Sequence, residues 1–288
     1  DDNPEPEDLR ELPVYKHLFF MMEHKGIEWA VIYGHRKGQH YNHQYANTLG
    51  VPWIWRVDDD VILEPQVLEN LACHIKDDVG AIGGSVYMSP NLFTNEHPTG
   101  LIDNIDREAS LQWTTITEIQ EVQHLHCTFL YRAGVADYNL GLSKVAHREE
   151  TLFTYSLFQK GYRLLAVPNA ACWHLKSPSG GIRQDTNYDM FARDDEIFHN
   201  FMEYRDRTIV VLNCGMGDHI VFTKVLPHLH DPVVFTCYPE IIPGLSIGEA
   251  EQKFGSIEQW SIYKKMDEWK WTGSLEDAFR KLYLGRHA

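Results

Sequence analysis

The chain opens with apolar residues at helical spacing. Between residues 8 and 25 they recur every three or four positions, and the pattern stops at Gly26, where a helix end is expected. We therefore predict a helix over 8–25. The apolar run WAVIY at 29–33 follows and predicts a short buried strand.

Short apolar runs then alternate with helical patterns. WIWRV at 53–57 predicts a strand that ends at the acidic triplet Asp58, Asp59 and Asp60, and a helix is expected to start near Pro65. The remaining elements are strands at 80–88, 126–132 and 162–168 and a helix across 149–160. This alternation is typical of an α/β fold, in which helices cover both faces of a mainly parallel, Rossmann-type sheet.

The pattern starts again near residue 205. RTIVVLNCGMGDHIVFTKVL at 207–226 predicts a strand, a Gly-containing turn and the start of a helix, and the segments 247–255 and 274–284 have the apolar spacing of amphipathic helices. We therefore divide the chain into a domain over 1–205 and a small α/β appendage over 206–288.

Composition narrows the class of protein. The chain has 288 residues, 43% of them hydrophobic, and no apolar run is long enough for a transmembrane helix. A formal charge of −15 argues against nucleic acid as a partner, because binding to the phosphate backbone relies on clustered Lys and Arg. The five cysteines lie far apart and form no CxxC pair, so we expect no disulfide framework, no zinc site and a reducing, cytoplasmic location.

The acidic triplet is the first candidate for chemistry. Asp58 and Asp60 are two positions apart, so both can point to the same side of an extended segment. Mg²⁺ and Mn²⁺ take one or two protein carboxylates and fill their other positions with water and substrate phosphate oxygens. A solvated acidic turn that caps the following helix is an equally good interpretation of the triplet alone.

A second acidic pair and a histidine follow. Glu149 and Glu150 open the helix of 149–160, where carboxylates also simply stabilise the exposed amide groups of a helix start. His174 ends the segment LLAVPNAACWH, and a single histidine there is more often structural than a ligand. Each of these signals leaves its structural alternative open.

Taken in order, these elements resemble the catalytic domain of glycosyltransferase family 2, which has the GT-A fold. The resemblance covers about residues 15–175 and includes a DXD motif, an acidic pair twelve residues before Gly-Tyr-Arg, and the ending VPNAACWH. In KGQHYN, Asn42 takes the place of the family's Asn, and CTFLYR resembles the strand whose Arg, here Arg132, precedes the acidic pair.

The resemblance implies a site and an activity. It makes Asp58 and Asp60 the metal carboxylates, joined by His174, and it makes Glu150 the catalytic base beside Glu149. Asn42, Asp58 and Asp59 are expected to bind the nucleotide. The implied cofactor is Mn²⁺ or Mg²⁺, the implied donor is a nucleoside-diphosphate sugar, and the implied acceptor is a carbohydrate or another hydroxyl compound. The expected reaction is an inverting glycosyl transfer.

The chain departs from the family pattern in three places. No segment before residue 8 resembles the family's first strand, so this strand is expected to be missing from the domain of 1–205. WAVIY runs into Gly34, His35 and Arg36 where the family has acidic residues, and the usual Glu-Asp pair is here a Glu-Glu pair.

Two Gly-containing segments give weaker signals. SPSGGIRQD at 177–185 can move, so Lys176 and Arg183 could close over a diphosphate, although an ordinary surface loop explains the segment equally well. NCGMGDHIVF at 213–222 resembles the turn that opens heptosyltransferase-like domains of the GT-B class. Only one such unit fits after residue 206, so we expect an accessory role for this segment.

Two other functions are compatible with the same residues. A metal-dependent nucleotidyltransferase could use the same acidic strand end. An inactive module that binds carbohydrate or nucleotide would explain the missing first strand. Release of sugar from a nucleotide sugar, without a new phosphoester, separates the leading prediction from the nucleotidyltransferase. Calorimetry with nucleoside diphosphates and Mn²⁺ tests the binding module.

Overall fold

The structure is a computed structural model. It describes residues 7–34, 36–88, 98–101, 112–175, 188–205, 208–212, 215–229, 232–236, 261–265 and 268–271. The described residues fall into two compact units, which divide between Asp195 and Glu196 inside the helix α5 (Tyr188–Tyr204). The domain division predicted at residue 205 stays a prediction.

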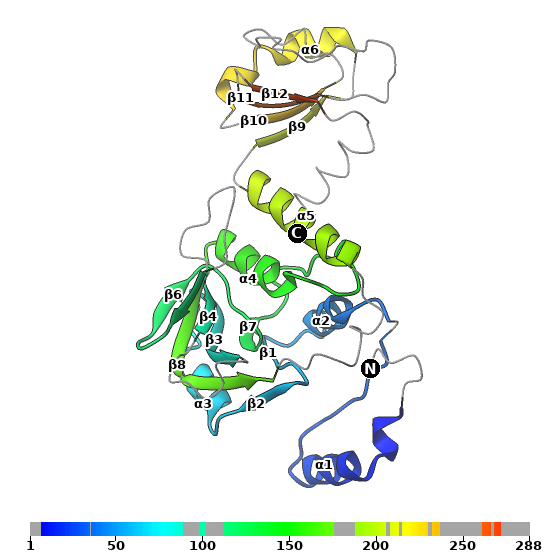
Figure 1. Cartoon of the computed structure of the whole chain (residues 1–288), viewed down its shortest axis with the longest axis vertical. Coiled ribbons are helices and arrows are strands. Elements are labelled where there is room, and N and C mark those ends of the chain that lie inside the picture. The colour runs from blue at the N-terminus through cyan, green and yellow to red at the C-terminus, as the bar shows by residue number, and fades with distance from the viewer. Residues whose placement is uncertain are drawn as a thin grey trace. The chain divides into compact units, whose positions relative to one another are not determined.

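The first unit is built on a six-stranded sheet in the order β1-β7-β3-β8-β2, with β6 paired to β8 (Figure 1). The strands are β1 (Trp53–Arg56), β2 (Val61–Leu63), β3 (Val79–Met88), β6 (Gln120–Val122), β7 (Phe129–Arg132) and β8 (Arg163–His174). A separate ladder joins β4 (Pro98–Leu101) to β5 (Gln112–Thr115). The strands predicted at 53–57, 80–88, 126–132 and 162–168 are therefore present.

The sheet is mixed, and the expectation of a mainly parallel sheet is corrected. Among the described strand pairs of this sheet, only β3 and β8 run parallel. β7 lies between β1 and β3 and is antiparallel to both, while β2 and β6 are antiparallel to β8. An apolar run specifies burial but not strand direction, which explains why the sequence pattern missed this arrangement.

Five helical segments precede or flank this sheet, in addition to α5. They are η1 (Leu9–Glu11), α1 (Pro13–His24), α2 (Gln39–Asn47), α3 (Val67–Ala72) and α4 (Glu149–Gln159). The helix predicted over 8–25 is thus a short 3₁₀ turn followed by α1. The strand predicted at 29–33 is wrong, because this segment is irregular and Ile32 remains 51% exposed instead of packing in a sheet.

Two apolar layers sandwich β3 and β8. Ala81 of β3 packs with Phe153 and Leu157 of α4, whereas the neighbouring Ile82 packs with Leu71 of α3. Because successive strand residues point to opposite faces, α4 and α3 cover opposite faces of the sheet (Figure 1). The α/β prediction of helices on both faces is confirmed.

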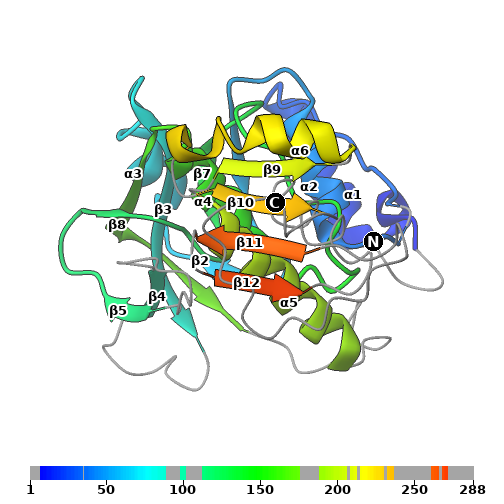
Figure 2. The same ribbon diagram turned by 90° about the horizontal axis from the view of Figure 1, so that it is seen from above.

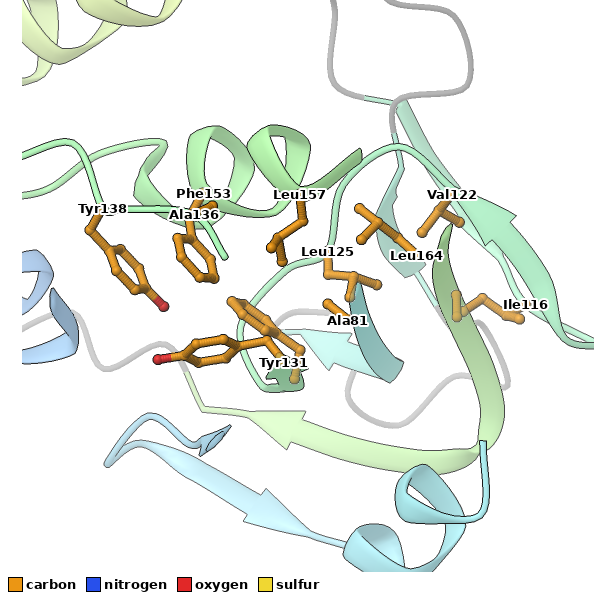
Figure 3. Close-up of a cluster of buried hydrophobic side chains, with 12 residues drawn as sticks. Ala81, Ile116, Val122, Leu125, Tyr131, Ala136, Tyr138, Phe153, Leu157 and Leu164 are labelled. Carbon is orange, nitrogen blue, oxygen red and sulfur yellow. The ribbon is translucent and has the colours of Figure 1, made fainter. Parts of the chain in front are cut away.

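Aromatic rings fill the layer under α4. Tyr138 stacks on Phe153 with ring centroids 3.9 Å apart and an interplanar angle of 4°, and Tyr131 meets Phe153 edge to face at 4.9 Å (Figure 3). Burial of three large rings in one layer contributes several kcal/mol of stability, at roughly 1.5–3 kcal/mol for each large side chain. This layer fixes α4, which begins with both candidate glutamates.

One glycine allows β8 to bend across β3. A Cβ atom at Gly84 would lie 1.5 Å from the carbonyl oxygen of Ala170, so no side chain fits at this position. The pairing of β3 with β8 shifts register between Gly84 and Val86, after which Met88 pairs with His174. The bend thereby directs the end of β8 toward β2.

The second unit contains a four-stranded sheet in the order β12-β11-β10-β9, seen as one row in Figure 2. Its elements are β9 (Thr208–Leu212), α6 (Met216–Phe222), η4 (Leu226–His228), β10 (Pro232–Thr236), β11 (Ser261–Lys265) and β12 (Glu268–Trp271). The predicted strand and helix around Gly215 are present, and β9 and β10 are parallel. The helices predicted at 247–255 and 274–284 lie outside the described residues.

Within the described part of the chain, none of the helices combines the length and the apolar character needed to cross a membrane. The predicted cytoplasmic location stays a prediction.

Candidate functional site

The acidic triplet lies in the turn that joins β1 to β2. The antiparallel pairing of β2 with β8 sets Val61 opposite His174, and the backbone N–H of Leu175 donates to the carbonyl oxygen of Asp60. These contacts bring the side chain of Asp60 against the imidazole, with Oδ1 at 3.2 Å from Nε2 of His174. Two residues predicted for the metal site are therefore neighbours. The strand before the triplet, β1, is at the edge of the described sheet and not at its centre.

Arg56, the last residue of β1, organises the carboxylates. Its side chain is 1% exposed, and its Nη1 lies 2.6 Å from Oε1 of Glu149. Its Nη2 donates to Oδ1 of Asp58 at 3.2 Å and to Oε1 of Glu150 at 3.4 Å. One buried guanidinium thus contacts three acidic side chains from two separate elements.

The two adjacent glutamates have different surroundings. The side chain of Glu149 is fully buried and also accepts a hydrogen bond from Nε2 of Gln39, whereas the side chain of Glu150 is 17% exposed. Burial raises the pKa of Glu149 to about 8, although Arg56 opposes this rise. Burial also raises the pKa of Glu150, but the positive charge of Arg56, electrostatic interactions with His126 and His174 and a backbone hydrogen bond together lower this pKa. Glu150 is the ionised and accessible member of the pair.

Hydrogen bonds to a residue of α5 fix the loop that precedes α4. The buried carboxylate of Asp194 accepts hydrogen bonds from the backbone N–H and the hydroxyl of Ser143 and from the backbone N–H of His147. Arg148, which precedes α4, has a left-handed φ of 69°, a conformation that side chains other than Gly seldom adopt. The loop is therefore fixed in an uncommon conformation just before Glu149.

Asp58 and His174 form a cluster of potential metal ligands with Cys127. One ligand atom from each of the three residues lies within 4.8 Å of the other two. Nε2 of His174 is held by Asp60, and its Nδ1 is buried with no hydrogen-bond partner in the described structure. An orphaned buried imidazole nitrogen is costly unless a ligand uses it, so these residues fit a metal ion. Burial raises the pKa of Asp58, and Arg56 opposes the rise.

Cys127 occupies an unusual backbone position two residues before the start of β7. Its φ is 63°, and it is fully buried beside Cys172. A hydrogen bond with Cys172, together with burial, raises the pKa of the Cys127 thiol far above its ordinary value. Without a metal this side chain is therefore a neutral thiol.

Of the other predicted residues, two are exposed and two lie outside the described residues. Asp59 is exposed, and Asn42 is an exposed residue of α2 whose amide packs closely against Gly34. Lys176 and Arg183 lie outside the described residues.

Sequence reasoning missed Arg56 and Cys127. For Arg56 the signal was available: a charged residue at the end of the apolar run WIWRV is rarely buried unless it is paired, and three carboxylates were already candidates nearby. For Cys127 no local pattern exists, because its neighbours in the cluster of potential metal ligands are far away in the sequence.

Comparisons with known proteins bear on the fold. No protein-family model and no curated protein sequence matches the chain. Among solved structures, the chain is similar to "Crystal structure of GalNAc-T7 with UDP, GalNAc and Mn2+", with 14% sequence identity and a TM-score of 0.51. The match covers 72% of this chain and 42% of that one, so the chain spans less than half the length of that protein. The fold is GT-A-like.

Membership of glycosyltransferase family 2 stays a prediction, because a match at this identity establishes the fold alone. A second similar structure is the inositol-1-phosphate CTP transferase from T. maritima, with 15% identity and a TM-score of 0.34 over 64% of this chain and 73% of that chain. That TM-score is too low to carry a structural argument.

Proposed function

We propose that this chain is a metal-dependent, inverting glycosyltransferase that moves a sugar from a nucleoside-diphosphate sugar to an acceptor hydroxyl. The position of Glu150 carries the proposal: its carboxylate is held ionised beside Arg56, is partly open to solvent and belongs to the same acidic cluster as Asp58. A protein with the same fold has been crystallised with UDP, GalNAc and Mn²⁺, which supports this choice of substrate class.

The outer carboxylates are proposed to hold the donor. Asp58, Asp60 and His174 would bind Mn²⁺ or Mg²⁺, and the bound ion would neutralise charge on the departing diphosphate. Asp60 has a defined task in the described geometry, because its contact with Nε2 of His174 fixes the orientation of the imidazole. Asn42, Asp59, Lys176 and Arg183 remain proposed contacts of the nucleotide.

Glu150 is proposed to act as the general base. Its carboxylate would take the proton from the acceptor hydroxyl as the hydroxyl oxygen forms a bond to the anomeric carbon, and the bond from that carbon to the diphosphate oxygen breaks. Arg56 keeps Glu150 ionised and ready to accept this proton. Glu149 is buried away from any acceptor, so we assign it to positioning Arg56.

The test measures binding and products together. Calorimetry with a nucleoside diphosphate should show tighter binding in the presence of Mn²⁺ in the unmodified protein, and Asp58→Asn should abolish this coupling. Glu69→Gln, an exposed change of the same charge in α3, serves as the control. Equal nucleotide affinity with and without metal in the unmodified protein would contradict the proposal.

Product analysis separates the alternative functions. A glycosyltransferase releases a nucleoside diphosphate from a nucleotide sugar and joins the sugar to the acceptor. A nucleotidyltransferase instead forms a new phosphoester and releases pyrophosphate. Metal-dependent nucleotide binding without any product would indicate a binding module.

A further inference from the structure

The cluster of potential metal ligands around Asp58 includes a sulfur atom that the proposed transfer does not use. Cys127 is fully buried, and its thiol belongs to the group of three ligand atoms that lie within 4.8 Å of one another, with Asp58 and His174. Asp60 contacts His174 but is not a member of that group. The metal ligands suggested by geometry thus differ from the metal ligands suggested by the DXD motif.

The backbone supports a specific placement of this thiol. Cys127 has a φ of 63°, in the left-handed region that is unfavourable for a non-Gly residue, and such strained conformations are concentrated at functional sites. The hydroxyl of the next residue, Thr128, donates to the carbonyl oxygen of Arg56 and ties this turn to β1. The turn therefore holds Cys127 next to the strand end that carries Asp58.

The histidine is arranged as a metal ligand usually is. Its Nε2 faces Oδ1 of Asp60, so a proton on Nε2 leaves a lone pair on Nδ1. This Nδ1 is buried in a residue that is only 8% exposed, and it has no hydrogen-bond partner in the described structure. A carboxylate on one imidazole nitrogen and a metal on the other is the common arrangement of ligating histidines.

We propose that Asp58, Cys127 and His174 form a site for a thiophilic divalent cation of the Zn²⁺ or Co²⁺ class, with Asp60 orienting His174. The inference rests on the proposed function in one respect: the cation occupies the site assigned there to the metal. Thiolate ligands favour such ions, whereas Mg²⁺ prefers oxygen ligands. Three protein ligands also leave one position open for a substrate oxygen, as catalytic zinc sites do.

Coordination changes the protonation of the cysteine. The neutral thiol of Cys127 loses its proton to solvent when the sulfur binds the cation, so one proton is released for each ion bound. The search for paired cysteines in the sequence could not find this site, because its three ligands come from three separate segments of the chain.

Cobalt absorption tests the ligand set directly. Co²⁺ titrated into the full chain should give a sulfur-to-cobalt charge-transfer band in the near ultraviolet together with visible ligand-field bands. Cys127→Ser should remove the charge-transfer band and lower Co²⁺ and Zn²⁺ affinity by at least about tenfold, while Mg²⁺ affinity changes little. Cys127→Gly is the second variant, because Gly adopts the left-handed φ without strain.

Two cysteine controls make the result specific. Cys172→Ser changes the buried neighbour, and Cys73→Ser changes an exposed thiol, so the band should persist in both. Ligand-field bands without the charge-transfer band in the unmodified protein, a band that survives in both Cys127 variants, or no Co²⁺ binding at all would overturn the proposal.

The readout is independent of sugar transfer. A charge-transfer band that depends on Cys127 in a chain that transfers no sugar with any metal would refute the proposed function and keep the metal site. Sugar transfer with Mn²⁺ in a chain that shows no charge-transfer band would support the proposed function and refute the metal site with Cys127.

Discussion

The acidic cluster has two ends with opposite electrostatic arrangements. At the inner end the protein supplies its own cation, Arg56, which is buried against Glu149. At the outer end potential ligand atoms of Asp58, Cys127 and His174 lie within 4.8 Å of one another, Asp60 contacts Nε2 of His174, and Nδ1 of His174 is buried without a hydrogen-bond partner in the described structure. The inner end has its own cation, although Nε of Arg56 and Oε2 of Glu149 are buried without a hydrogen-bond partner in the described structure. The outer end is the part of the cluster that we propose to hold an added ion.

This difference separates stability from function. A buried ion pair whose partners are all present resists change, because removal of one charge leaves the other buried and uncompensated. An incomplete set of ligands instead costs stability until its ligand binds. We therefore expect inner-end substitutions to affect mainly folding, and outer-end substitutions to affect mainly ligand binding and turnover.

The largest expected effect separates the two glutamates. Glu150→Gln should lower the rate of sugar transfer about 10²–10⁴-fold, because a general base typically contributes that factor, and donor affinity should stay nearly unchanged. Steady-state rates and calorimetric donor affinities measure both quantities. Glu149→Gln, which removes a carboxylate with no exposure, should keep most of the turnover. Loss of sugar transfer in Glu149→Gln, with normal transfer in Glu150→Gln, would show that Glu149 and not Glu150 is the general base.

The next effect concerns the inner cation. Arg56→Met should lower the free energy of unfolding by about 3–5 kcal/mol, because three neighbouring carboxylates lose their shared partner. Urea unfolding measures this change. Arg56→Lys keeps the charge but loses the planar guanidinium, so its free energy of unfolding should lie between those of the unmodified protein and Arg56→Met.

The matched control for Arg56 is a surface arginine. Arg163 makes ion pairs with Asp78 and Glu121, but its side chain is 41% exposed. Arg163→Met should therefore lower the free energy of unfolding much less than Arg56→Met does, because solvent screens an exposed ion pair. Equal losses for Arg56→Met and Arg163→Met would show that the inner end is not a special structural element.

A smaller effect is expected at the outer end. Asp60→Asn should weaken divalent-metal affinity about 10–100-fold, because the carboxylate no longer fixes the imidazole of His174. Isothermal titration with Mn²⁺ and with Zn²⁺ measures it, and urea unfolding without metal should show little change. A large loss of stability with unchanged metal affinity would remove the distinction between the two ends.

A further effect at the inner end is a dependence of stability on pH. The pKa of Glu149 rises from 4.5 to about 8 on folding, so the native state binds the extra proton and this group's contribution to stability falls as the pH rises through that interval. Unfolding free energies at about pH 6 and about pH 9 should differ less in Glu149→Gln than in the unmodified protein. Glu69→Gln should keep the original difference, and an unchanged difference in Glu149→Gln would contradict the assignment.

The sequence was sufficient for most elements of the first unit but not for their directions. Apolar runs located β1, β3, β7, β8 and α4, because burial of these segments depends on composition. The mixed sheet could not be predicted, since strand direction depends on distant pairings such as that of Trp53 with Arg132. α2 was missed because its sequence QHYNHQYAN is mostly polar, and only His40 and Asn47 are buried.

The candidate site could be predicted from the sequence only for those residues that match the motifs of glycosyltransferase family 2. The motif order selected Asp58, Asp60, Glu150 and His174, and in the structure Asp60 lies beside His174 while Asp58 belongs to the same cluster of potential metal ligands as His174. The motif does not encode Arg56 or Cys127, because both act through contacts with residues from other elements. The assigned catalytic and metal-binding roles stay predictions until they are measured.

The distance along the chain between the partners in this cluster has a consequence for folding. Gln39 and Glu149 are 110 positions apart, and Arg56 and Glu150 are 94 positions apart. Each of these contacts closes a loop of about a hundred residues, whose entropic cost must be met before the contact contributes stability. We therefore expect the cluster to form late in folding, after the elements that carry its residues have come together.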